Sequence, residues 1–222
     1  MLRSQPASGS GHEALASQWV RCLVHGRRHE LDGALLEARA RLGSWSRVAD
    51  EVAAALAELG ARWANDRVTI AQEHAASDAL NRALARVGDT LPSRLDGPTC
   101  LLAAVGEDEH TLGLSLAELC LREQAWTPLW LGRRTPLTEV LRLVEESRVA
   151  KVVLSASCAV DDDRFLQETA DQVGQACKEQ GVTLVLGGGG SWPDPPTYGT
   201  RLNSFSAFGD YLAEGATRGI RR

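Results

Sequence analysis

Apolar residues recur at helical spacing through the first part of the chain. The clearest stripe is Val48, Val52, Leu56, Leu59 and Trp63. Residues spaced in this way lie on one face of a helix. Breaks at residues 25–28, 42–44 and 64–68 divide this region into four helical segments. The pattern therefore predicts a four-helix bundle over residues 13–88.

The pattern changes after residues 89–98, a segment with two prolines that is predicted to be a linker. Short apolar runs at residues 99–105, 126–132, 150–157 and 182–190 then alternate with helical patterns, and a short edge strand near residues 200–202 and a last helix follow. This alternation predicts a parallel, doubly wound sheet. In the common strand order 2-1-3-4-5, the first, third and fourth strands are neighbours. The predicted fold class is α/β with an N-terminal all-α region, and the α/β domain covers residues 99–222.

Composition excludes several functions and settles none. The net charge is -5 and no run of five Lys or Arg residues occurs, so we expect no direct DNA binding. No apolar run approaches the roughly 20 residues that cross a bilayer, and residues 1–12, rich in Ser, Gly and Pro, are predicted to be disordered. We expect a cytoplasmic protein with no membrane partner. The five cysteines form no CxxC pair, which argues against a disulfide framework and a zinc site.

The segment GEDEHTLG, residues 106–113, directly follows the first predicted strand of the sheet. In an open parallel sheet, ligands bind at this edge. A nucleotide pyrophosphate would meet Glu107, Asp108 and Glu109 here, so a dinucleotide site is disfavoured. Asp108 could instead accept a hydrogen bond from one ring nitrogen of His110 and leave the other nitrogen as a metal ligand.

Two further features follow neighbouring strands at the same predicted edge. Ser155 and Ser157 end the third strand, and Gly187 and Gly188 follow the fourth, where a bulky group can lie directly on the backbone. Each feature alone has an ordinary explanation. A histidine after a strand is usually a surface or capping residue, a serine there usually ends the strand, and glycines usually make a turn.

Together these residues resemble the cobalamin-binding domain family, whose pattern is Asp-x-His-x-x-Gly, then Ser-x-Leu, then Gly-Gly. Asp108, His110 and Gly113 match the first element, Ser155 the second, and Gly187 with Gly188 the third. The resemblance implies that His110 is the lower axial ligand of cobalt, in place of the cofactor's own dimethylbenzimidazole. It also implies that the nucleotide tail runs past Ser155 and Gly187. Ser157 departs from the family, which often has leucine there.

In the helical region, Trp63 is followed ten residues later by Glu73 and His74, just after Thr69 and Gln72, which suggest a capping box. Taken singly, Trp63 ends an apolar stripe, Glu73 complements a helix dipole, and His74 is a core histidine. Taken together, they resemble the cap of CarH-type adenosylcobalamin photoreceptors, a four-helix bundle followed by a cobalamin domain. The resemblance implies that Trp63 packs near the adenosyl group and that Glu73 and His74 contact its ribose.

This resemblance implies a light sensor and not an enzyme, with adenosylcobalamin as its cofactor. It further implies a light-dependent homo-oligomer, a dimer or tetramer, that signals to an effector protein of unknown identity. Two departures matter. CarH-type repressors carry an N-terminal DNA-binding domain, which we do not expect here. Ala64 stands where they have a histidine that binds cobalt after illumination, so His74 is left as the candidate for that role.

Other interpretations stay open. The first alternative is a corrinoid methyl carrier of a methyltransferase system, although such carriers usually continue Asp-Ile-Gly-Lys-Asn after the histidine and this chain has residues 111–115, TLGLS. The small subunit of an adenosylcobalamin mutase is a third, which would need a separate substrate barrel. Biliverdin as a second chromophore is a further possibility, with residues 191–198, Trp126 and Trp130 as its wall.

Overall fold

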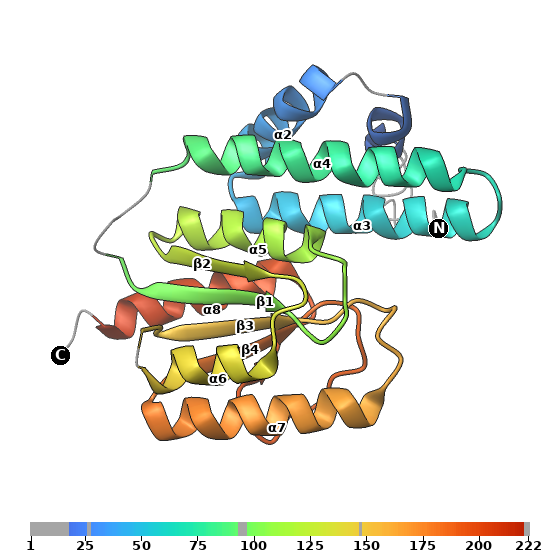
Figure 1. The fold of residues 1–222 in the computed structure, drawn as a ribbon. Helices are drawn as coiled ribbons and strands as arrows, with labels where there is room; N and C mark the ends of the chain where they lie inside the picture. Colours follow the sequence, from blue (N-terminus) through green and yellow to red (C-terminus); the bar gives the residue numbers. More distant parts are fainter. Residues whose placement is uncertain (1–17, 26–27, 93–96, 147, 220–222) are drawn as a thin grey trace, which may run out of the picture. The chain divides into compact units, whose positions relative to one another are not determined.

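The computed structural model describes residues 18–25, 28–92, 97–146 and 148–219. The chain divides into two compact units, Met1–Val87 and Gly88–Arg222, each with its own core (Figure 1). The segment predicted to be disordered, residues 1–12, lies outside the described residues. None of the helices in the described ranges is long and apolar enough to span a bilayer.

The N-terminal unit is helical, as predicted. Its described helices cover residues 18–25, α2 (Arg28–Leu42), α3 (Trp45–Ala64) and α4 (Ile70–Thr90). The α2–α3 turn contains Gly43, whose positive φ of 81° suits glycine, and Ser44, whose side chain accepts a hydrogen bond from the Arg47 N–H at 3.3 Å. α4 runs two residues into the segment predicted to be a linker, of which residues 93–96 lie outside the described residues.

The apolar stripe predicted for α3 is buried in the middle of the helix but not at its end. Val48, Val52 and Leu59 are almost completely buried, but Trp63 is 48% exposed. Periodicity gives the face on which a residue lies, not whether another element covers that part of the face. The buried residues of α3 end at Leu59, and they are Trp45, Ser46, Val48, Ala49, Val52, Ala55 and Leu59.

The C-terminal unit contains one parallel sheet with the predicted order, β2-β1-β3-β4-β5. Its elements are β1 (Thr99–Ala104), α5 (Leu112–Glu123), β2 (Thr127–Gly132), α6 (Leu137–Glu145), β3 (Lys151–Ser155), α7 (Asp163–Gln180), β4 (Thr183–Gly187), β5 (Thr200–Arg201) and α8 (Phe205–Gly219). The first strand lies between the second and third, so the carboxyl ends of β1, β3 and β4 lie next to one another. This is the edge at which the sequence places its candidate ligands.

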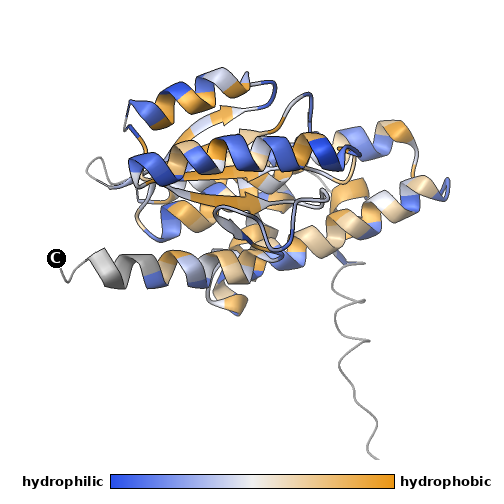
Figure 2. Cartoon of the chain, turned by 90° about the horizontal axis from the view of Figure 1, so that it is seen from below, coloured by the Kyte–Doolittle hydropathy of each residue, from blue (hydrophilic) through white to orange (hydrophobic). Residues whose placement is uncertain are grey.

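Helices cover both faces of this sheet (Figure 1). One face packs on α6 and α7 through a core that includes Leu101, Val152, Leu154, Val140 and Leu166. The strands are accordingly hydrophobic, whereas the helices that surround them show hydrophilic outer faces (Figure 2). A strand buried on both sides is typical of a parallel sheet, and every residue of β3 is buried.

Lys151 is a buried charge at the amino end of β3. Its side chain is 5% exposed, and its Nζ donates to Thr183 Oγ1 at 2.8 Å. The same Nζ lies over the rings of Tyr211, at 4.4 Å, and Trp126, at 5.1 Å. Burial lowers the pKa of Lys151 below its ordinary value, and the nearby Cys100 acts in the opposite direction. The hydroxyl and the two ring faces therefore stabilise an ammonium group that burial disfavours.

All five cysteines are free thiols, as the sequence predicts. Cys100, Cys120 and Cys177 are buried. Burial raises the pKa of Cys100 and of Cys177 to about 12, so both thiols stay protonated and unreactive at neutral pH.

Candidate functional site

The loop between β1 and α5 carries His110 at the carboxyl edge of the sheet. The β1 ladder continues one residue into this loop, where Val105 N–H donates to Ser155 O at 3.1 Å. Gly106 then turns the chain with a φ of 55°, and a Cβ at this position would lie 2.8 Å from the ring of Phe165. Only glycine fits both the backbone angle and this close approach.

Asp108 holds His110 in a defined orientation. The carboxylate oxygen Oδ1 accepts from the backbone N–H of His110 at 3.0 Å and lies 2.8 Å from His110 Nδ1. It also accepts from Ser157 Oγ at 2.9 Å, while Oδ2 accepts from the Ser157 N–H at 2.7 Å. Ser157 Oγ lies 3.1 Å from His110 Nδ1. These three side chains form one network that joins the loops after β1 and β3.

The network fixes the charge of Asp108 and the tautomer of His110. Burial alone would raise the pKa of Asp108, but the hydrogen bonds from Ser157 and His110 outweigh it and leave the pKa below its ordinary value. An ionised carboxylate can only accept hydrogen bonds, so Nδ1 carries the proton that faces it. The His110 side chain is 66% exposed, whereas that of Asp108 is fully buried. The nitrogen left available to a metal is therefore Nε2.

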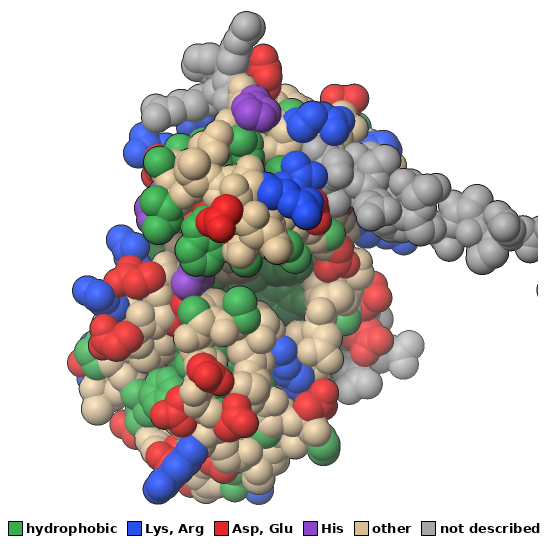
Figure 3. Space-filling view, turned by 90° about the vertical axis from the view of Figure 1, so that its right-hand side faces the viewer, with side chains coloured by type: hydrophobic (Ala, Val, Ile, Leu, Met, Phe, Trp, Pro, Cys, Tyr) green, Lys and Arg blue, Asp and Glu red, His purple; other side chains and the backbone are tan. Residues whose placement is uncertain are grey.

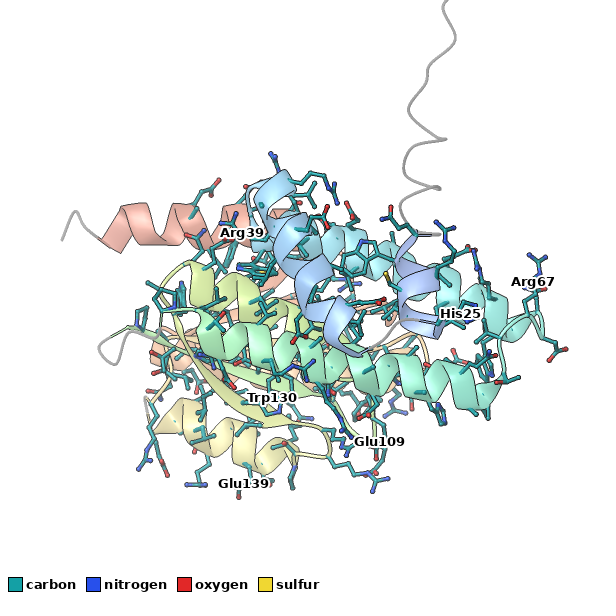
Figure 4. All side chains as sticks on the ribbon, turned by 90° about the horizontal axis from the view of Figure 1, so that it is seen from above. His25, Arg39, Arg67, Glu109, Trp130 and Glu139 are labelled. Carbon is teal, nitrogen blue, oxygen red and sulfur yellow. The ribbon has the colours of Figure 1, made fainter. Side chains whose placement is uncertain are left out.

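The other two acidic residues of the loop form ion pairs and do not contact the imidazole in the described structure. Glu109 lies 2.8 Å from Arg133 Nη1 and 2.6 Å from Arg134 Nε, and Glu107 lies 3.4 Å from Arg134 Nε. Figure 4 labels Glu109 in this loop. Both arginines follow β2, and Arg134 has a φ of 54°, which is unusual for a residue other than glycine. The space-filling view shows acidic and basic side chains next to one another on this face (Figure 3).

The serine and glycine elements meet at the same edge. Ser155 pairs with Gly187 in the β3–β4 register. A Cβ at Gly113, the second residue of α5, would lie 3.7 Å from Ser155 Oγ. Gly188 has a φ of 88°, and a Cβ there would lie 2.2 Å from Ala156 O, closer than any side chain can approach. The structure therefore brings Ser155 together with all three predicted glycines.

Two features of this edge escaped the sequence analysis. The first is the pairing of Arg133 and Arg134 with the acidic loop, which their position directly after a neighbouring strand could have suggested. The second is Arg201 on β5, whose Nη2 donates to Gly188 O at 2.7 Å. No local pattern marks Arg201, because its contact depends on how the edge strand pairs with β4.

The predicted residues of the N-terminal unit lie near the α3–α4 turn. The capping box is confirmed, since Thr69 N–H donates to Gln72 Oε1 at 2.9 Å and Gln72 N–H donates to Thr69 Oγ1 at 3.2 Å. Glu73 Oε2 lies 2.6 Å from His74 Nδ1. The His74 side chain is 73% exposed, so it is not a core histidine. Trp63 and His74 are thus surface residues in need of another explanation.

The structure does not assemble the predicted wall for biliverdin. Trp126 and Trp130 belong to the β2 side of the sheet, whereas residues 191–198 precede β5, and these two strands are opposite edges of the sheet. Trp192 is 5% exposed and donates from Nε1 to Gly187 O at 2.8 Å. It is a core residue that supports the glycine turn, so the geometry gives no support to this second chromophore.

Comparison with known proteins supports a relationship to cobalamin-binding proteins. Residues 15–87 match the family described as B12 binding domain. This match lies in the helical region and ends before β1. The chain is also 31% identical over 140 residues to the HTH-type transcriptional repressor CarH of Myxococcus xanthus, a match that covers 63% of this chain and 46% of CarH. It thus spans about half the length of that relative.

The fold of the chain is also similar to that of a solved corrinoid protein. The monomethylamine corrinoid protein of Methanosarcina barkeri is similar with a TM-score of 0.67 and 14% sequence identity. The similarity covers 90% of this chain and 96% of that protein. At this identity, the likeness supports the predicted combination of helical and α/β regions, and it says nothing about what the chain does.

The residues at the sheet edge fit a cobalamin. Within the described ranges, no group of three or more His, Cys, Asp and Glu side chains could enclose a bare metal ion. A corrin ring supplies most ligands of its cobalt, so one histidine held by one carboxylate is sufficient. The glycine turn presents backbone without side chains beside it, which a large, polar tail can approach closely.

Proposed function

We propose that this chain is a light-sensing module that binds adenosylcobalamin and signals to a partner, and that it is not itself an enzyme. The observation that carries the proposal is the orientation of His110. Its Nδ1 faces the buried carboxylate of Asp108 at 2.8 Å while most of its side chain remains exposed. A ring held in this way would present Nε2 to a metal ion.

Residues of the chain would hold the cofactor from the protein side. His110 would coordinate cobalt, Asp108 and Ser157 would keep the imidazole in one tautomer, and Gly187 and Gly188 would leave space for the nucleotide tail. When bound, adenosylcobalamin supplies a cobalt–carbon bond that light can break. The choice of the adenosyl form rests on the similarity to CarH and on the resemblance of Trp63, Glu73 and His74 to the cap of CarH-type receptors.

Signalling requires that dark and illuminated states differ in their contacts, because a ligand shifts an equilibrium only through differential interactions. We propose that this difference appears as a change in homo-oligomeric state. Trp63 has a large apolar side chain that is exposed. The resemblance to CarH-type receptors implies that this side chain packs near the adenosyl group. Its replacement by alanine should reduce the preference for adenosylcobalamin over methylcobalamin, which dissociation constants measured in darkness would show.

The direct test is reconstitution followed by illumination. Apoprotein is mixed with adenosylcobalamin in darkness, freed of excess cofactor, and its visible spectrum is recorded before and after a light pulse. We expect bound cofactor with its dimethylbenzimidazole displaced, and a lasting spectral change after light. His110→Ala should lose this spectrum. His25→Ala, which changes an exposed histidine of the N-terminal unit, is the matched control and should keep it.

The same material tests the remaining parts of the proposal. Light scattering of dark and illuminated holoprotein should give two different masses. Equal masses would remove the assembly change from the proposal. Preferential binding of methylcobalamin, with transfer of its methyl group to a partner's substrate, would instead support a corrinoid methyl carrier and refute the light sensor.

A further inference from the structure

Arg201 on β5 holds the backbone of the glycine turn that follows β4. Its Nη2 donates to Gly188 O at 2.7 Å, and its Nη1 donates to Leu186 O at 3.3 Å. Longer contacts of 3.5 Å reach Gly190 O and Leu202 O. A guanidinium is a rigid planar fork, so it can span two carbonyl groups in a way that a single ammonium cannot.

The guanidinium of Arg201 is partly buried, so its contact with the turn differs from an ordinary surface ion pair. Burial lowers the pKa of Arg201, and the charge of Asp194 opposes this effect. The hydrogen bonds that Arg201 makes within the described part of the chain all go to backbone carbonyls. A partly desolvated cation with only carbonyl acceptors stabilises one conformation of that backbone.

The turn is asymmetric in its hydrogen bonds. Gly187 O accepts from Ala156 N at 3.2 Å and from Trp192 Nε1 at 2.8 Å, and Gly188 O accepts from Arg201. By contrast, the N–H groups of Gly188 and Gly189 donate to no acceptor among the described residues. Both glycines are exposed. In this turn the carbonyls of Gly187 and Gly188 are therefore occupied, and two backbone donors are available to a ligand.

We propose that Arg201 is a positioning residue of the cofactor site. It fixes the carbonyls of the turn, which keeps the N–H groups of Gly188 and Gly189 available for acceptor oxygens on the nucleotide part of a cobalamin. The phosphodiester is the anionic group of that part, and successive backbone N–H groups near a positive charge suit such oxygens. This inference rests on the proposed cobalamin binding and assigns Arg201 no contact with cobalt.

The test compares two corrinoids that differ in the nucleotide. Wild-type apoprotein, Arg201→Gln and Arg201→Lys are titrated in darkness with aquocobalamin and with aquocobinamide, which has the same ring but lacks the nucleotide and its phosphodiester. We expect Arg201→Gln to bind cobalamin about tenfold more weakly, the effect of about one charge-assisted hydrogen bond, with little change for cobinamide. Arg201→Lys should recover only part of the loss, because it keeps the charge without the fork.

Controls separate this role from a general effect on folding. Arg142→Gln removes an exposed arginine of α6 that pairs with Glu139 and Glu146, and it should change neither affinity. Thermal unfolding of each apoprotein identifies variants that do not fold. If Arg201→Gln does not fold, the test uses the ratio of cobalamin affinity to cobinamide affinity in Arg201→Lys. An equal loss for both corrinoids, or no loss for either, would overturn the proposal. Failure of the wild-type protein to bind either corrinoid would instead refute cobalamin binding itself.

Discussion

Asp108→Asn is the substitution that most directly tests the proposed axial ligand. The Asp108 carboxylate accepts four hydrogen bonds, three at Oδ1 and one at Oδ2. An amide has only one acceptor oxygen, so its NH₂ group must face a donor in either orientation. The less costly orientation keeps the oxygen toward His110 and places NH₂ against the Ser157 N–H. This loses one hydrogen bond and sets two donors face to face at a partly buried position.

The substitution should have two measurable effects. The unmatched donors should lower the free energy of unfolding by about 1–3 kcal/mol. Cobalamin affinity should fall by about 10–100-fold, as for other residues that orient a metal-binding histidine. That range corresponds to about 1.4–2.7 kcal/mol of binding free energy. The ring would still be held, but by a neutral amide that makes Nε2 a weaker donor to cobalt.

Urea denaturation of the apoprotein measures the first effect, and titration with aquocobalamin followed by absorbance measures the second. Glu107→Gln is the matched control, because its side chain is 88% exposed and pairs only at 3.4 Å with Arg134. It should change the affinity by less than about fivefold. If Asp108→Asn binds with wild-type affinity and an unchanged spectrum, the carboxylate does not support the ligand and the reasoning is wrong.

Three further predictions follow from the same edge of the sheet. Gly188→Ala should lower the melting temperature by several degrees and the free energy of unfolding by at least about 2 kcal/mol, because the new Cβ would collide with Ala156 O. Gly181 has a similar φ but no atom within 4 Å of a Cβ, so Gly181→Ala should be less destabilising. Ser157→Ala keeps the backbone donor to Asp108 and removes only one of the four hydrogen bonds to the carboxylate, so it should weaken cobalamin binding less than Asp108→Asn does. An equal or larger loss in the titration would contradict this. Because the pKa of Asp108 is lower in the folded state than in the unfolded chain, where it is about 3.9, the ionised carboxylate stabilises the fold above that pH and loses this effect as the pH falls. The difference in unfolding free energy between wild type and Asp108→Asn, measured in urea, should therefore shrink below about pH 4. A difference that grows there would refute the assignment.

Sequence reasoning found those parts of the site that are local in the chain. Asp108 and His110 are two residues apart after a buried strand, so their hydrogen bond needs no long-range information. The strand order was also predictable, because strands that alternate with helices have few topologies open to them. Ser157 was identified as a departure from the family pattern. Its hydroxyl bonds to Asp108 and His110 only because the loop after β3 returns beside the loop after β1.

The remaining features depend on contacts that a linear pattern does not specify. Trp63 continues the apolar spacing of α3, but whether another element covers that end of the helix is a property of the packed unit. The pairing of β5 with β4 places Arg201 beside Gly188, although a strand of only two residues, Thr200–Arg201, gives almost no periodic signal. The wall expected from residues 191–198 and two tryptophans failed for the same reason, since it joined opposite edges of one sheet.

The network of Asp108, His110 and Ser157 is complete in the structure of the protein alone. The conformational entropy of orienting the imidazole is therefore lost during folding and not when a corrinoid arrives. A ligand that meets a ring already in place can associate without waiting for the protein to rearrange. The same rigidity limits what this loop can do afterwards. In the proposed light sensor, an imidazole held this tightly would be a fixed point, so the movement that carries the signal would begin on another part of the chain.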